Sequence, residues 1–163
     1  MTRSARLLIT IACAAACALP ASASAADPGR WDEVGRSTMP LNYFQGVAST
    51  AGGDLLFDGI NVGLYRTSSQ LTEEATVANA IPSAVSAAPP AGEGYNHLGD
   101  IAAANGVVYL PLECYYPGAG GNTCQTGSIG VADPATLAWS YYVRLDETYI
   151  QKAMWVATST DGT

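Results

Sequence analysis

The chain has 163 residues, with seven Lys plus Arg against fourteen Asp plus Glu and a formal net charge of −7. Only 13% of the residues are charged, against about 25% in an average soluble protein. Binding to a nucleic-acid phosphate backbone requires a basic patch, and this composition excludes it. Seventeen Gly, nine Pro and nine Tyr favour many short strands joined by turns over long helices.

Residues 1–25 have the organisation of a signal peptide. Two arginines precede an apolar run over 7–19, and an Ala-Ser-Ala sequence then ends at Ala25. This order predicts export and cleavage between Ala25 and Ala26. Loss of the two arginines would change the formal charge from −7 to about −9. The apolar run is too short to span a bilayer, and no later segment resembles a transmembrane helix.

Removal of the leader leaves two cysteines, Cys114 and Cys124. An even pair in an exported chain predicts a disulfide. The alternative, a zinc site, is disfavoured because the two cysteines are separated by nine residues and have no nearby His. The disulfide is expected to close a local loop.

After a lead-in over 26–44, short apolar strands recur at a fixed interval. They begin around Val47, Ile101 and Val156, and each is followed by a turn that contains glycine. The intervals are 54 and 55 residues. A period near 50 is typical of propeller blades.

Each full period contains four expected strands. In the first period they are 46–51, 54–58, 62–67 and 74–78, and in the second they are 98–103, 107–112, 128–133 and 139–145. The pattern predicts an all-β protein of four-stranded antiparallel blades with a period of about 54 residues. The expected blades are 45–78, 97–146 and the start of a third at 153–163.

Three sequence stretches carry a resemblance to a known family: YNHLGDI at 95–101, GVVYLPLE at 106–113 and GSIGVAD at 127–133. Over 45–163 the chain resembles secreted bacterial β-propellers of the quinoprotein-like, seven-bladed type. Such propellers close with four to eight blades. The resemblance therefore implies the N-terminal part of a longer chain that holds the remaining blades. The alternative is a complete small β-sandwich, or a chain that closes by oligomerising.

The Asn-Gly turn at 105–106 predicts how the second blade begins. Pairing 98–103 with 107–112 places Leu98 opposite Glu113. His97, Asp100 and Glu113 would then gather at one end of the hairpin. The linker 79–96 and the disulfide loop are expected to reach that same end.

These three side chains, together with Asn96, are the candidate ligand or metal site. They could hold a divalent cation such as calcium, or polarise a substrate. The alternative is that His97 and Asp100 are hydrogen-bonded packing residues and Glu113 is a solvated loop acid. Strand alternation puts His97 and Asp100 on opposite faces unless a bulge intervenes.

Two functions are compatible with these patterns. The first is an exported binding or scaffold module that recognises an unknown extracellular ligand through the loop face of its blades. The alternative is a lactonase-like propeller hydrolase with a channel metal near His97 and Asp100. A ring of acids at the start of each first strand would favour the enzyme. The positions that match Asp100 are Gly46 and Trp155, and this favours the binding module.

Overall fold

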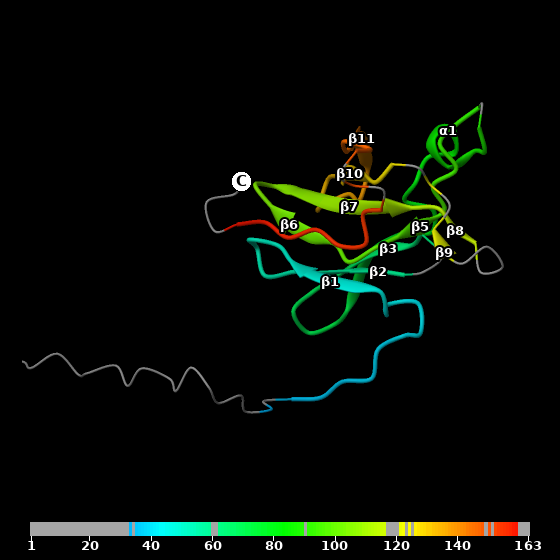
Figure 1. The fold of residues 1–163 in the computed structure, drawn as a ribbon. Coiled ribbons are helices and arrows are strands. Elements are labelled where there is room, and N and C mark those ends of the chain that lie inside the picture. Colours follow the sequence, from blue (N-terminus) through cyan, green and yellow to red (C-terminus); the bar gives the residue numbers. More distant parts are fainter. Residues whose placement is uncertain are drawn as a thin grey trace, which may run out of the picture. The chain divides into compact units, whose positions relative to one another are not determined.

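The computed structural model describes residues 33, 35–59, 62–89, 91–116, 121–122, 124, 126–148, 150 and 152–159 (Figure 1). The predicted signal peptide, its cleavage site and residues 160–163 lie outside the described residues. The chain divides into two units, 1–36 and 37–163. All the strands described below belong to the second unit.

The first sheet is an antiparallel meander of four short strands. They are β1 (Gly46–Ser49), β2 (Leu55–Asp58), β3 (Leu64–Thr67) and β4 (Glu73–Val77), and their order in the sheet is β1-β2-β3-β4. The turn between β1 and β2 is closed by Thr50, whose Oγ1 accepts a hydrogen bond from the Asp54 amide at 3.1 Å. Gly53 in this turn has a φ of +89°, a conformation that costs glycine little.

The second sheet repeats this plan with an interrupted first strand. Its strands are β5 (His97–Leu98), β6 (Ala102–Ala104), β7 (Val107–Glu113), β10 (Ser128–Ala132) and β11 (Trp139–Arg144). Both β5 and β6 pair with β7, which pairs with β10 and then β11. Asn105 and Gly106 have φ values of 53° and 75°, as the predicted Asn-Gly hairpin turn requires. The predicted all-β architecture of four-stranded antiparallel sheets is therefore confirmed.

A bulge separates β5 from β6 and changes the expected register. Leu98 pairs with Leu112 and Ala102 pairs with Tyr109, so 99–101 on one strand lie opposite 110–111 on the other. One extra residue is the definition of a β-bulge. The predicted pairing of Leu98 with Glu113 is wrong, because His97 is the residue opposite Glu113.

One helical turn and one short two-stranded hairpin were not predicted from the sequence. A single helical turn, α1 (Ser83–Ser86), lies within the linker 79–96. Inside the disulfide loop, β8 (Tyr115–Tyr116) pairs with β9 (Gly121–Asn122). Elements this short are below the window in which hydrophobic periodicity is detectable.

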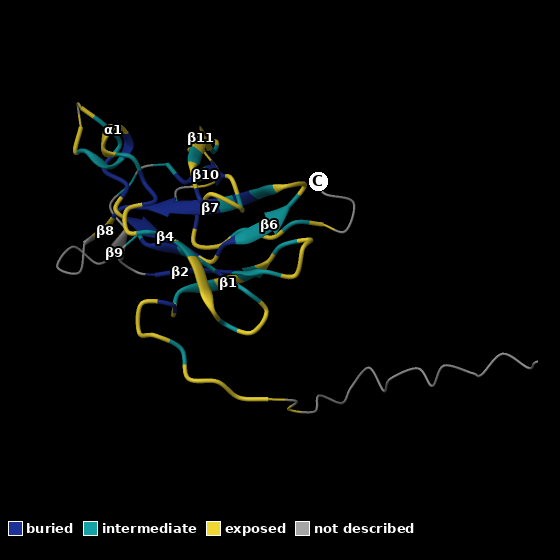
Figure 2. Ribbon diagram, turned by 180° about the vertical axis from the view of Figure 1, so that it is seen from behind, coloured by how far each residue is buried: buried dark blue, intermediate teal, exposed yellow. Residues whose placement is uncertain are grey.

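The two sheets share one hydrophobic core, shown in dark blue in Figure 2. Leu56 and Leu64 come from the first sheet, and alternate residues of β7 come from the second. The β7 contribution is Val108, Leu110 and Leu112, all fully buried. Ile81 and Tyr95 of the linker extend the same cluster. No helix among the described residues is long and apolar enough to cross a membrane.

The three positions that the 54-residue period makes equivalent lie side by side. A Cβ placed on Gly46 would be 2.9 Å from the Cα of Asp100. Asp100 forms a parallel bridge with Trp155, and the Asp100 amide donates to the Met154 carbonyl at 3.0 Å. The first strands of both sheets and the segment 153–159 are thus neighbours, which Figure 1 shows as the red segment beside β6.

Candidate functional site

His97 and Glu113 meet at the end of the second sheet, opposite each other across β5 and β7. The His97 Nδ1 lies 3.1 Å from the Glu113 Oε2, without the geometry of a hydrogen bond. Both side chains are buried, and Glu113 is only 4% exposed. The interpretation of Glu113 as a solvated loop acid is therefore wrong. The predicted proximity of His97 and Glu113 is confirmed.

Lys152 joins this pair from a distant part of the chain. Its Nζ lies 3.8 Å from the Glu113 Oε1, so the carboxylate sits between an imidazole and an ammonium group. Lys152 is the only lysine of the chain. Lys152 was not predicted as a site residue, because a single lysine does not show which sheet edge its segment contacts. The one available signal was that lysine is so rare in this acidic chain.

Asn96 makes two hydrogen bonds to the disulfide loop at the end of the sheet where His97 and Glu113 lie. Its Oδ1 accepts a hydrogen bond from the Tyr115 amide at 2.7 Å, and its Nδ2 donates to the Tyr115 carbonyl at 3.0 Å. The Tyr115 ring lies 5.3 Å from the His97 ring, between centroids. Asn96 is thus a positioning residue that sets the place of Tyr115 over His97.

Cys114 and Cys124 form the predicted disulfide, with a Cα–Cα distance of 5.2 Å. Cys114 directly follows Glu113, so the bridge holds the loop beside the His97–Glu113 pair. The Cys114 Sγ also lies 3.7 Å from the Glu93 carbonyl, which brings the linker 79–96 to this end as predicted.

Loss of the disulfide is expected to lower the free energy of unfolding by about 2–3 kcal/mol, because a bridge over a short loop removes that much chain entropy from the unfolded state. The two cysteines are 10 positions apart in the chain. Urea unfolding of the double variant Cys114→Ala, Cys124→Ala would measure the loss. The wild-type protein treated with a reductant is the control and should lose the same amount. An unchanged midpoint in both would contradict the prediction.

Asp100 does not join His97 and Glu113 in one cluster. It is exposed at the bulge, where its charge acts on Asp58 at the end of β2. Within the described part of the chain, no group of three or more His, Cys, Asp or Glu side chains is arranged to hold a metal ion. The four candidate residues are therefore divided between two places. Asn96, His97 and Glu113 lie at one, and Asp100 lies at the other.

Asp58 is a buried acid that was not predicted from the sequence. It is 0% exposed, and neither carboxylate oxygen has a hydrogen-bond partner among the described residues. Burial and then the negative charge of Asp100 raise its pKa to about 7, although the nearby amides of Asp58 and Gly46 act in the opposite direction. An acid that ends an apolar run, as in LLFD at 55–58, was the available signal.

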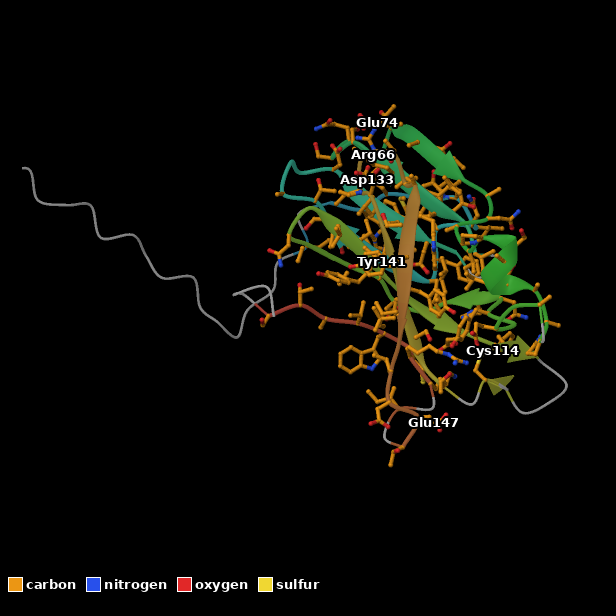
Figure 3. All side chains as sticks on the ribbon, turned by 90° about the horizontal axis from the view of Figure 1, so that it is seen from above. Arg66, Glu74, Cys114, Asp133, Tyr141 and Glu147 are labelled. Atoms are coloured by element: carbon orange, nitrogen blue, oxygen red, sulfur yellow. A yellow bond between two sulfur atoms is a disulfide. The ribbon has the colours of Figure 1, made fainter. Side chains whose placement is uncertain are left out.

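One surface hollow borders Asp100, and a second lies apart from the candidate residues. A groove of about 340 Å³ has Asp100 in its wall, with aromatic side chains on the other side; its lining is Tyr43, Phe44, Gln45, Gly46, Val47, Phe57 and Asp100. A larger hollow of about 520 Å³ lies at the turns, beside Arg66. Arg66 is neutralised there by Asp54 at 2.8 Å and Glu74 at 3.1 Å. Figure 3 shows Arg66 and Glu74 together, well apart from Cys114.

No family model and no curated protein sequence matches the chain. Among solved structures, a europium-containing methanol dehydrogenase is similar, with a TM-score of 0.41 and 12% sequence identity. The match covers 61% of this chain and 15% of the dehydrogenase. Similarity at this level carries no information about activity or ligand.

Proposed function

We propose that the protein is an exported binding module of the β-propeller type, and that it recognises its ligand through the end of the second sheet. The recognition surface consists of Asn96, Tyr115 and Lys152, and the buried His97 and Glu113 lie beneath it. The observation that supports it is the buried Glu113 carboxylate, which lies between His97 and Lys152.

A buried ionic group of this kind is a poor choice for stability alone. Taking a carboxylate out of water costs several kcal/mol, and apolar residues of similar volume often stabilise a protein as well or better. The arrangement does, however, set the position of the Lys152 ammonium group. A small number of precisely placed polar or charged groups is typical of binding sites.

Tyr115 supplies the apolar part of the proposed surface. Its side chain is 39% exposed and stands on a loop that is fastened by Asn96 and the disulfide. An exposed aromatic ring on a rigid support gives contact area at low entropic cost. Together with the Lys152 ammonium group at Glu113, this ring suits a hydroxyl-rich or anionic ligand that has one apolar face.

The alternative function, a lactonase-like hydrolase, would need His97 and Asp100 to hold one channel metal. The contacts of His97 are with Glu113 and Tyr115, whereas Asp100 faces Asp58 and the segment 154–156. This separation supports the binding module over the hydrolase.

We further propose that additional blades of the same kind pack against the second sheet in a longer chain. The support is the outer face of that sheet, where apolar residues of β7, β10 and β11 line a groove of about 340 Å³ that includes Val156. Tyr141 and Trp155 on or beside this face are 56% and 67% exposed, and Figure 3 shows Tyr141 on β11. Contiguous exposed apolar surface is typical of an interaction site.

The recognition surface can be tested with a polysaccharide and glycan array probed by the purified protein. For a glycan that binds, we expect Tyr115→Ala and Lys152→Ala each to weaken the affinity about tenfold or more, because each removes a direct contact worth about 1–2 kcal/mol. Isothermal titration calorimetry measures the change. Glu147→Gln, an exposed acid in the turn after β11, is the matched control. Wild-type affinity in both variants would contradict the proposed surface.

A further inference from the structure

The Asp58 carboxylate faces the junction between the two sheets. Its Oδ1 lies 2.6 Å from the position that a Cβ on Gly46 would occupy, and the same position is 2.9 Å from the Asp100 Cα. The absence of a side chain at Gly46 therefore leaves Asp58 directed toward the Asp100 bulge. Both Asp58 oxygens are fully buried and without a hydrogen-bond partner among the described residues.

Burying a carboxylate without a partner is costly, so a compensating charge or proton is required. The basic side chains that the structure describes are all engaged with other acids. Arg36 pairs with Glu33, Arg66 with Asp54 and Glu74, Arg144 with Glu93, and both His97 and Lys152 with Glu113. Asp100 is the other titratable group that acts on Asp58. Its negative charge increases the need for a compensating positive charge or proton.

We infer that Asp58 and Asp100 bind a divalent cation of the calcium class at the junction of the two sheets. Two carboxylates are the hard oxygen ligands that calcium prefers, and main-chain carbonyl groups and water commonly complete its coordination. Asp100 provides the access route, because it is exposed and lines the groove beside Gly46. The bound cation would join the end of β2 to the bulge between β5 and β6.

This site differs from the one expected from the sequence, which placed calcium among His97, Asp100 and Glu113. It also does not depend on the proposed recognition surface at Tyr115 and Lys152. Extracellular calcium-binding modules typically have dissociation constants of about 0.1–1 mM. A site with an affinity in this range would be half filled when free calcium equals its dissociation constant, and nearly filled at about 10 mM.

The test is thermal unfolding of the purified full chain at pH 7.5, after treatment with EDTA and then with 10 mM CaCl2. We expect calcium to raise Tm of the wild-type protein by about 3–6 °C, because a ligand that binds only the folded state stabilises it. Asp58→Asn and Asp100→Asn should each abolish most of that shift. Glu147→Gln removes one acidic charge elsewhere and should retain the full calcium-induced rise in Tm. Isothermal titration calorimetry with CaCl2 gives the corresponding loss of binding.

Three results would overturn the inference. The first is an equal calcium shift in the wild-type protein and both variants. The second is an equal shift with NaCl at matched ionic strength. The third is no calcium shift in a wild-type protein whose Tm rises as the pH is lowered from 8 to 5, since a proton alone would then satisfy Asp58. Asp100→Asn keeps the test valid if Asp58→Asn does not fold, because Asp100 is exposed.

Discussion

Replacing Asp58 with Asn is expected to stabilise the protein at pH 8, in the absence of divalent cations, by about 2–4 kcal/mol. Burial, followed by the charge of Asp100, raises the pKa of Asp58 from 3.8 to about 7 in the folded state. One pKa unit corresponds to about 1.4 kcal/mol. The raised pKa of the acid means that its ionised form destabilises the fold, and Asn has no ionised form.

The pH dependence follows from the same shift. The Asp58 pKa is 3.8 in the unfolded chain and about 7 in the folded protein, so the folded state binds more protons between these values. The free energy of unfolding must therefore fall as pH rises through this window. Above about pH 7, Asp58 no longer changes it appreciably. At pH 4 the variant and the wild-type protein should differ little.

Urea unfolding at pH 4, 5, 6, 7 and 8 in the presence of EDTA would measure this effect. The difference between Asp58→Asn and wild-type protein should grow with pH and then level off. Glu147→Gln, which removes an exposed acid, should run parallel to the wild-type curve. A difference for Asp58→Asn that stays constant from pH 4 to pH 8 would show that the pKa of Asp58 is not raised.

Gly46→Ala is expected to destabilise the protein by about 3 kcal/mol, because the added methyl group overlaps atoms of both sheets. Its Cβ would lie 2.6 Å from the Asp58 Oδ1 and 2.9 Å from the Asp100 Cα and the Ile101 nitrogen. The Asp58 side chain could rotate away, but the other two atoms belong to the backbone of the second sheet. Overpacking of a tight junction typically costs 1–3 kcal/mol, and occasionally more.

The matched control for Gly46→Ala is Gly52→Ala in the turn between β1 and β2. There the nearest atom to the added methyl group is the Thr50 Oγ1 at 3.7 Å, an ordinary contact. Guanidinium unfolding of the two variants gives the comparison. A cost at Gly46 no greater than the cost at Gly52 would mean that β1 does not lie as close to the Asp100 bulge as the structure places it.

Local signals were sufficient to predict the strands. The eight strands expected in the two full periods are all found, and their ends agree to within two residues, with the first strand of the second sheet interrupted. The strand expected around Val156 is not found among the described residues, where the segment has only an isolated bridge between Trp155 and Asp100. Alternation of apolar residues and turn signals such as Asn105-Gly106 act between neighbours in the chain, so they can be read without the fold. The disulfide was predictable for a similar reason, since the two cysteines outside the predicted leader permit one pairing.

The register at the candidate site was not predictable in the same way. The bulge lies at Gly99–Ile101, where a Cβ on Gly99 would be 2.1 Å from the Met154 carbonyl. The residue that constrains Gly99 therefore comes from more than 50 positions further along the chain. A one-residue slip exchanges the faces of a strand, so this distant contact decided that His97, and not Leu98, lies opposite Glu113.

The sequence by itself thus determined the all-β class, the strand positions, the cysteine pair and the end of the hairpin where His97 and Glu113 meet. Only the tertiary structure separated Asp100 from that pair, brought Lys152 to Glu113 and buried Asp58 beside Gly46. The physical reason is that burial and charge proximity depend on which segments pack together. Periodicity reports how a strand alternates between faces, but it does not report what covers each face.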